Sequence, residues 1–417
     1  MKNKLFLIFV MTLFSLQKSN SQTMPTSAIP ISTATGTVTV TTCPFITSDA
    51  KGNVVMSFGK EIKGKDAVLC YSFFDEKANK FGQPIEIPSS KGVELHGENA
   101  PKIVFKPNGE IIAVWGIDNP TPKKKYDGLI QYSQSFDKGK SWTPAIPLVK
   151  DSAGIDQRYF DIDLLPNGEA AIIWLDNRSK TELQGSSLYY AETKGRSGFQ
   201  NEKSIGETTC QCCRTDLYIG KNGVIYTAYR DIINDEIRDM VLSYSSDNGK
   251  TFSEPKRISP DDWKINGCPH TGPTMTQNTS GLHFAWFTMG GGAGVFYANS
   301  SDSGIRFSQR ESVSDNPSAK HPQIATLNND VLIVWDETTE VDGNYFNRIG
   351  LQHRSRNGSV LNTRFITAAE VSATFPIVKA LNEKEVLVAW SQGGKEGKVC
   401  YKVVRMESDG KNNSPKL

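Results

Sequence analysis

Short runs of apolar residues, each preceded by turn-forming residues, recur along the whole chain. Runs such as 110–115 and 331–335 are brief and rich in β-branched side chains, which predicts strands rather than helices. Strand-like segments precede and follow most runs, and the sequence has no helical period. The pattern therefore predicts an all-β chain. Each run ends on an aromatic residue: Phe58, Trp115, Trp174, Tyr229, Trp286, Trp335 and Trp390.

These aromatic residues recur at intervals of 57, 59, 55, 57, 49 and 55 residues. A period near 55 residues with three or four strands per repeat is typical of a β-propeller. Seven repeats predict seven blades, and six blades with one repeat miscounted is the alternative. The last repeat ends after its third strand, so residues 35–42 are expected to complete the last blade and close the ring. The propeller is expected over 35–405, between a polar leader at 22–34 and a polar tail at 406–417.

The first 21 residues have the three-part form of a secretory signal. Lys2 and Lys4 precede an apolar stretch at 5–14, and small residues follow at 19–21. The mature chain is expected to begin at Gln22 and to be secreted or periplasmic, where disulfides can form. A net charge of +2 gives no electrostatic reason to expect nucleic acid. No later apolar stretch approaches the roughly 20 residues that span a bilayer.

Three repeats carry the pattern Ser-x-Asp-x-Gly-x-x-aromatic directly after their third strand. Serine and aspartate oxygens can accept backbone N–H groups in a tight turn, glycine permits a positive φ, and the aromatic ring can pack back on the hairpin. The residues are Ser135, Asp137, Gly139 and Trp142; Ser245, Asp247, Gly249 and Phe252; and Ser300, Asp302, Gly304 and Phe307.

This pattern resembles the Asp-box, or bacterial neuraminidase repeat, of the sialidase superfamily, and the resemblance covers nearly all of the mature chain. It implies that these turns lie on the propeller face opposite the active site. We therefore interpret Asp137, Asp247 and Asp302 as structural residues that cap their own turns.

Charged residues concentrate in the loops that would meet at the other face. In a propeller, the loops entering each first strand and the loops between second and third strands surround one mouth of the central channel. A polar mouth of mixed charge predicts a ligand site. The candidate ligand-binding residues are Arg158, Asp176, Arg178, Arg214, Arg230, Asp231, His321, Asp336 and Glu337.

The resemblance implies a glycan or another acidic ligand at this mouth. Sialidases hold a substrate carboxylate with three arginines, and Arg158, Arg214 and Arg230 lie in neighbouring repeats. The Arg-Ile-Pro signature of the family is absent, because residues 41–46 read Thr-Thr-Cys-Pro-Phe-Ile. No residue is therefore assigned a catalytic role.

Cysteines and a histidine stand at the entrance of two successive repeats. Cys210, Cys212 and Cys213 open the fourth repeat, and Cys268 and His270 open the fifth. Thiolate and imidazole ligands suit copper or zinc. A disulfide from Cys268 to one of the other three cysteines is the favoured alternative, because export permits it.

Three functions follow from these features. The leading hypothesis is a secreted, sialidase-like propeller that binds a glycan or another acidic ligand, and whether it also hydrolyses the glycan is left open. The second is a non-catalytic propeller that binds a protein partner or assists assembly. The third is a metal or redox site on the cysteine and histidine loops.

Overall fold

The computed structural model describes residues 25–29, 39–62, 65–150, 155–178, 183–393 and 397–406. The predicted signal segment at 1–21 lies outside these residues, as do most of the leader and all but the first residue of the tail. Regular structure is almost entirely β-strand, which confirms the all-β prediction. No helix formed by the described residues is both long enough and apolar enough to cross a bilayer.

The strands form six antiparallel sheets that follow one another along the chain. The first holds β2 (Thr39–Ser48), β3 (Val54–Ile62), β4 (Val68–Asp75), β5 (Lys80–Phe81) and β6 (Ile85–Glu86); the second holds β7 (Lys102–Phe105), β8 (Ile111–Asp118), β9 (Gly128–Ser135) and β10 (Ile146–Pro147). The third has eight strands: β11 (Gln157–Leu164), β12 (Ala170–Asp176), β13 (Ser186–Thr193), β14 (Phe199–Thr209), β15 (Asp216–Ile219), β16 (Ile225–Ile233), β17 (Ile237–Ser245) and β18 (Lys256–Arg257).

The remaining three sheets have four strands each. They are β19 (Thr274–Asn278), β20 (Gly281–Thr288), β21 (Gly294–Ser300) and β22 (Glu311–Ser312); β23 (Lys320–Leu327), β24 (Asp330–Val341), β25 (Asn344–Arg354) and β26 (Val360–Phe365); and β27 (Ala373–Ala380), β28 (Glu385–Gln392), β29 (Lys398–Arg405) and β1 (Ser27–Ala28). The helical segments are single 3-10 turns: η1 (Pro88–Ser90), η2 (Gly97–Asn99) and η3 (Gly195–Ser197).

The N-terminal segments pair differently from the prediction. Residues 39–42, expected beside the last repeat, belong to β2 and pair with β3. The strand that pairs with β29 is β1, which lies in the predicted polar leader, with Ser27 opposite Tyr401. The prediction failed because residues 35–42 have the stronger β pattern, whereas β1 is two residues long and is held by its partner strand and by Ile29, which packs in the core.

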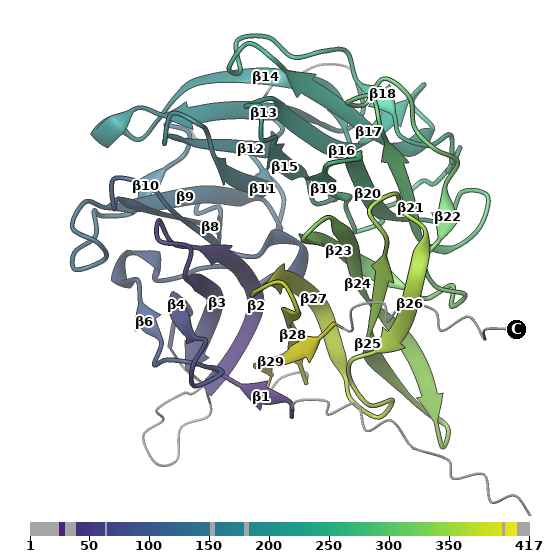
Figure 1. Cartoon of the computed structure of the whole chain (residues 1–417). Helices are drawn as coiled ribbons and strands as arrows, with labels where there is room; N and C mark the ends of the chain where they lie inside the picture. The colour runs from purple at the N-terminus through teal and green to yellow at the C-terminus, as the bar shows by residue number, and fades with distance from the viewer. Residues whose placement is uncertain are drawn as a thin grey trace, which may run out of the picture.

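Figure 1 shows the sheets arranged around a common centre, with β2, β11, β15, β19, β23 and β27 nearest to it. Each first strand contacts the next one around this centre, from β2 through β7 to β27 and back to β2. Aspartate side chains reinforce some of these contacts. Asp161 Oδ2 accepts a hydrogen bond from Leu217 N at 2.7 Å, and Asp216 Oδ2 accepts one from Met275 N at 2.8 Å.

The core lies between adjacent sheets, where the second strand of each repeat is buried on both faces. All seven aromatic residues that end the predicted runs are at most 1% exposed. Trp174 shows the arrangement, because it packs with residues of the preceding sheet such as Val114 and Tyr132. Replacing such a residue by alanine typically costs about 3–5 kcal/mol, so the repeated aromatic residues stabilise the packing of one sheet on the next.

Candidate functional site

In each of the three Asp-box-like turns, the serine and aspartate side chains form hydrogen bonds within the same turn. In the first, Ser135 Oγ donates to Asp137 Oδ1 at 2.9 Å, Gly139 N donates to Ser135 Oγ at 2.7 Å, and Ser141 N donates to Asp137 Oδ1 at 2.8 Å. The hydrogen bonds from Ser141 lower the pKa of Asp137 to about 2. Gly139 has φ of 86°, and a Cβ there would stand 2.5 Å from the hydroxyl of Tyr71. Ser135 and Asp137 therefore supply the hydrogen bonds of the turn, and Gly139 supplies its positive φ.

The other two turns repeat these contacts. Ser245 and Ser300 donate to Asp247 and Asp302 at 2.7 and 2.9 Å, and each aspartate accepts the backbone N–H four residues later. These carboxylates are engaged within their own turns, as expected for structural residues.

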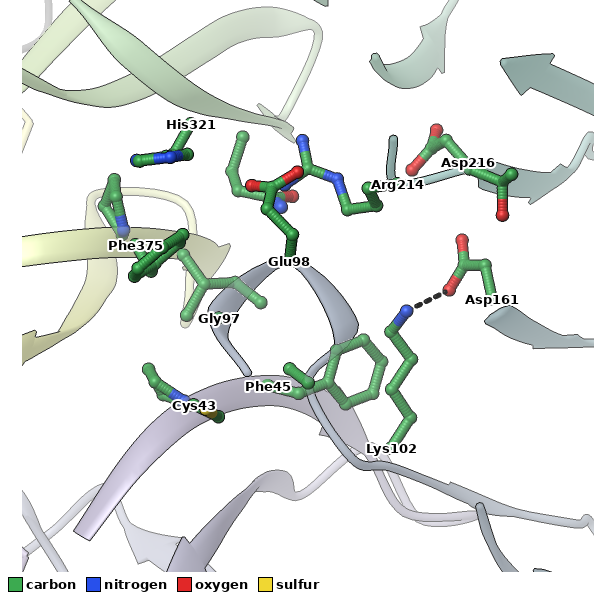
Figure 2. Close-up of a pocket in the computed structure, with 16 residues that line it drawn as sticks. Cys43, Phe45, Gly97, Glu98, Lys102, Asp161, Arg214, Asp216, His321 and Phe375 are labelled. Carbon is green, nitrogen blue, oxygen red and sulfur yellow. Dashed lines mark hydrogen bonds and ion pairs between the residues drawn. The ribbon is translucent and has the colours of Figure 1, made fainter. Parts of the chain in front are cut away.

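A cavity of about 90 Å³ lies where the first strands converge (Figure 2). It collects residues from β2, η2, β7, β11, β15, β23 and β27 or from the segments that lead into them, which makes it the best candidate for a ligand site. Its lining includes Cys43, Phe45, Glu98, Lys102, Asp161, Arg214, Asp216, His321 and Phe375.

Arg214 forms a buried ion pair at this cavity. Its Nη1 lies 3.0 Å from Glu98 Oε1, and the two side chains are 9% and 1% exposed. Arg214 Nη2 donates to the carbonyl oxygen of Pro322 at 3.0 Å. The second oxygen of Glu98 accepts a hydrogen bond from Gly272 N at 3.1 Å. The guanidinium is therefore already paired and hydrogen-bonded within the protein.

His321 and Phe375 form another part of the wall. His321 Nδ1 lies 2.7 Å from Asp336 Oδ2, which also accepts a hydrogen bond from Phe375 N at 2.8 Å. The two rings are 4.1 Å apart between centroids. Burial opposes protonation of His321, but the charge and hydrogen bond of Asp336 outweigh it and raise the pKa of the imidazole. Figure 2 shows both rings on the same side of the cavity as Cys43.

Carboxylates and a lysine line the side formed by β7, β11 and β15. Lys102 Nζ lies 3.2 Å from Asp161 Oδ1, the ion pair drawn in Figure 2. Burial, together with the neighbouring charge of Asp161, raises the pKa of Asp216. Both aspartates also bind backbone N–H groups of the next first strand, so their positions are explained by the packing of the ring.

Five residues in first strands or just before them have unusual backbone conformations. Cys43, Tyr159, His270, His321 and Phe375 have φ between 50° and 58°, a region that side chains with a Cβ seldom adopt. Four of these positions coincide with register shifts within β2, β11, β23 and β27. Such strain clusters at functional sites. Three of the five, Cys43, His321 and Phe375, line the central cavity and precede a proline, a repeated signal that the sequence analysis missed.

Several predicted ligand residues instead form contacts within the protein at the ends of second strands. Trp174 Nε1 donates to Asp176 Oδ2 at 3.1 Å, and Trp335 Nε1 donates to Glu337 Oε2 at 2.8 Å. The carboxylate two residues after the tryptophan thus satisfies the buried indole N–H. Arg178 pairs with Glu202, and its guanidinium lies 4.1 Å from the ring centroid of Tyr189.

The three candidate arginines do not converge. Arg158 makes a two-pronged contact with Asp156 at 2.6 and 2.8 Å and lines a separate cavity. Arg230 is fully buried and donates to the carbonyl oxygens of Arg238, Thr271 and Phe287. Only Arg214 of the three lines the central cavity. A three-arginine clamp for a carboxylate is therefore absent from the cavity.

Asp231 also lies away from the central cavity. It lines a different hollow beside β14 and accepts a hydrogen bond from Thr208 Oγ1 at 2.7 Å. Burial raises the pKa of its carboxyl group.

Three of the seven cysteines lie close together, and none of the seven is bridged. All seven cysteines, which lie within the described residues, are free thiols, so the favoured disulfide is not present. The sulfur of Cys210 lies 3.7 Å from that of Cys212 and 3.6 Å from that of Cys213. Hydrogen bonds from these two neighbours lower the pKa of Cys210. Cys268 and His270 line a cavity of about 450 Å³ together with Cys212.

Comparison with protein-family models and with curated protein sequences gives no match. Among solved structures, the BP39L lectin from Burkholderia pseudomallei is similar with a TM-score of 0.59 at 10% identity, over 89% of this chain and 96% of that one. A protein of unknown function from Dyadobacter fermentans DSM 18053 has a TM-score of 0.52 at 15% identity, over 93% and 99% of the two chains.

A mutant of the NanB sialidase from Streptococcus pneumoniae is similar with a TM-score of 0.50 at 10% identity, over 87% of this chain and 85% of that one. At these identities the likeness concerns the fold alone. The chain has an all-β fold of the β-propeller type, related at the level of fold to a lectin and to a sialidase.

Proposed function

We propose that this chain is a secreted β-propeller that binds a glycan at the central cavity. The observation that carries the proposal is the convergence, from several first strands, of two aromatic rings with hydrogen-bonding side chains in one small cavity. Sugar rings present apolar C–H faces and hydroxyl groups, so aromatic and polar side chains are suitable partners for them. Phe45, Phe375 and His321 are the side chains proposed to contact the sugar.

The propeller is proposed to have seven blades closed by β1. The eight-stranded sheet divides naturally into two blades, because β14 and β16 are joined by the single pair Thr209 and Asp231. The pairing of β1 with β29 supplies the fourth strand of the last blade. This arrangement supports a rigid ring that holds the cavity residues in place.

The geometry favours binding of a hydroxylated sugar over sialidase chemistry. Arg214 is neutralised by Glu98, and Arg158 and Arg230 lie outside the cavity lining. Asp161 and Asp216 are held by backbone N–H groups of neighbouring strands. The cavity volume of about 90 Å³ is small, so the proposed ligand is limited to a single terminal sugar unit that enters the cavity in part.

The proposal is tested by a glycan array followed by calorimetric titration of the mature protein. We expect binding of at least one terminal sugar, with affinity reduced at least tenfold in His321→Ala and Phe375→Leu. His353→Ala is a matched control, because His353 also pairs with an aspartate of β24, Asp330 at 2.9 Å, but does not line the cavity. This variant should bind the sugar like the wild type.

The same preparations separate the alternatives. Turnover of a fluorogenic sialoside that His321→Ala abolishes would replace the binding proposal by hydrolysis. Absence of any glycan binding, with all variants folded, would overturn the glycan proposal and favour a protein partner.

A further inference from the structure

The three cysteines that open the fourth repeat form a compact group of sulfur atoms. Cys210, Cys212 and Cys213 each place a sulfur within 4.8 Å of the other two, and all three residues are buried. A turn brings them together, since Cys213 N donates to the carbonyl oxygen of Cys210 at 3.4 Å. The group also packs in the hydrophobic cluster formed by β11, β12, β13 and β16, which shields the three sulfurs from solvent.

We propose that Cys210, Cys212 and Cys213 bind one Cu(I) ion through three sulfur atoms. Sulfurs bound at about 2.3 Å to one metal lie about 3.8 Å apart around a tetrahedral centre and about 4.0 Å apart around a trigonal one. The separations of 3.7 Å (Cys210 to Cys212) and 3.6 Å (Cys210 to Cys213) are close to these values and well above the length of a disulfide bond, and the third pair lies within 4.8 Å. Small outward movements of the side chains would complete the site.

The ligand set indicates which metal the site prefers. Thiolates are soft ligands that select Cu(I), zinc or iron–sulfur clusters. Structural zinc almost always takes four ligands, whereas the metal-ligating groups that meet here among the described residues are three sulfurs. Cu(I) accepts three sulfur ligands, so it fits the group without a fourth residue. Each thiol that binds releases its proton to solvent.

The guanidinium of Arg230 supplies a positive charge close to the three cysteines. Its side chain is fully buried, and the hydrogen bonds of its guanidinium go to carbonyl oxygens rather than to a carboxylate. The guanidinium acts electrostatically on Cys210 and Cys213, and the backbone oxygen of Arg230 accepts a hydrogen bond from Cys210 N at 2.8 Å. A buried cation requires a nearby negative charge. A copper–thiolate group, which is negatively charged, meets that requirement.

The neighbouring cavity gives the ion a route to the site. Cys212 lines the cavity of about 450 Å³ together with Cys268 and His270, and Cys268 is exposed. An ion that enters through this cavity would pass Cys268 and His270, because both line it. These two residues are assigned to the route and are not ligands in the final site.

The experiment loads the full mature protein with Cu(I) under anaerobic, reducing conditions and measures affinity by competition with a chromophoric Cu(I) chelator. We expect one ion per chain, and X-ray absorption with three sulfur neighbours and no nitrogen neighbour. Cys210→Ser, Cys212→Ser and Cys213→Ser should each weaken binding at least 100-fold. Cys268→Ser and His270→Ala should change it less than threefold, and Cys400→Ser is the control for loss of a buried cysteine elsewhere.

Circular dichroism of each metal-free variant establishes that it is folded, and the X-ray absorption of the wild type tests the ligand set even if a serine variant fails to fold. Absence of bound copper in the wild type would overturn the proposal. Retention of zinc in preference to Cu(I), a nitrogen neighbour, or an equal loss in His270→Ala would also overturn it, because each indicates a different ligand set. None of these outcomes depends on glycan binding.

Discussion

Arg214 and Glu98 are 116 residues apart in the chain, yet their side chains form a buried ion pair of 3.0 Å at the centre of the molecule. Arg214 precedes β15, and Glu98 lies in η2 before β7. The pair therefore links first strands that are not neighbours around the ring. Further hydrogen bonds to Gly272 and Pro322 extend the link to the segments before β19 and in β23.

Glu98→Ala should destabilise the protein, because it leaves the guanidinium of Arg214 buried without its carboxylate. Breaking a buried pair in this way costs about 3–5 kcal/mol. The measurement is the free energy of unfolding in urea. Replacing both residues by apolar ones, Glu98→Leu with Arg214→Met, should cost less than the sum of the two single changes.

The control for this prediction is Glu236→Ala, since Glu236 and Lys264 form an exposed pair with side chains 62% and 67% exposed. Loss of this exposed pair should leave the free energy of unfolding unchanged. If Glu98→Ala behaved like this control, the central pair would be dispensable for stability.

The sequence predicts the fold class well because the pattern of the second strands is local. A run such as 331–335 is buried on both faces and ends in an aromatic residue. Its continuous apolar sequence and its final aromatic residue can be recognised without knowledge of the partner strands. The three Ser-x-Asp-x-Gly turns can be recognised in the sequence for the same reason, because the hydrogen bonds of each turn join residues only a few positions apart.

The candidate site was harder to predict because it depends on distant partners. Arg158 lies at the start of the first strand β11, Arg214 just before the first strand β15, and Arg230 in the second strand β16. Their partners are Asp156, Glu98 and main-chain carbonyls respectively, and the sequence near each arginine does not indicate which partner it takes. Asp176 and Glu337 resemble ligand-binding carboxylates in sequence. Each accepts a hydrogen bond from the indole N–H two residues earlier, a contact that depends on the side-chain geometry at the end of the strand and not on the sequence pattern alone.

Ile29→Ala tests the role of the N-terminal strand. Ile29 follows β1, is 5% exposed, and packs with Val399 and Tyr401 of β29. Removing its side chain should lower the free energy of unfolding by about 2–5 kcal/mol, as for other buried isoleucines. Val360→Ala in β26, where the side chain is 50% exposed, should have little effect. Equal stability of the two variants would argue against closure by this strand.

The chain isolated from an exporting host should begin at Gln22. The basis is the positively charged start, the apolar stretch and the small residues at 19–21. Intact mass spectrometry of the exported protein provides the measurement. A mass that includes Met1 would contradict secretion by this signal.

His283 should make the stability depend on pH in mildly acidic solution. Burial, with the charge of Arg354, lowers the pKa of the imidazole to about 4. Below the usual value of 6.5, the unfolded chain binds a proton that the folded protein does not. Stability should therefore fall as the pH decreases from 6.5 towards 4, by at most about 1.4 kcal/mol per pH unit for this group.

His283→Phe removes this titration while keeping a ring against Tyr297, whose ring centroid lies 6.0 Å from that of His283. Urea unfolding of both proteins between pH 4 and pH 8 measures the difference. The difference in stability between wild type and variant should shift with pH only below about pH 6.5. A constant difference across the range would show that His283 is not responsible.

Asp247→Ala should lower the melting temperature without affecting the proposed sugar site. Asp247 accepts hydrogen bonds from Ser245 Oγ, Thr251 N and Thr251 Oγ1, and those from Thr251 hold the pKa of its carboxyl group below the usual range. A lowered pKa means that this stabilisation is present above the unfolded value of 3.8 and is lost as the pH falls through the folded value. The wild type should therefore lose stability in strong acid, and the variant should lose less.

Asp66→Ala is the control, because Asp66 is 58% exposed and pairs with the exposed Lys91. If Asp247→Ala weakened sugar binding as strongly as His321→Ala while leaving the melting temperature unchanged, the turn would belong to a ligand site and its structural interpretation would fail.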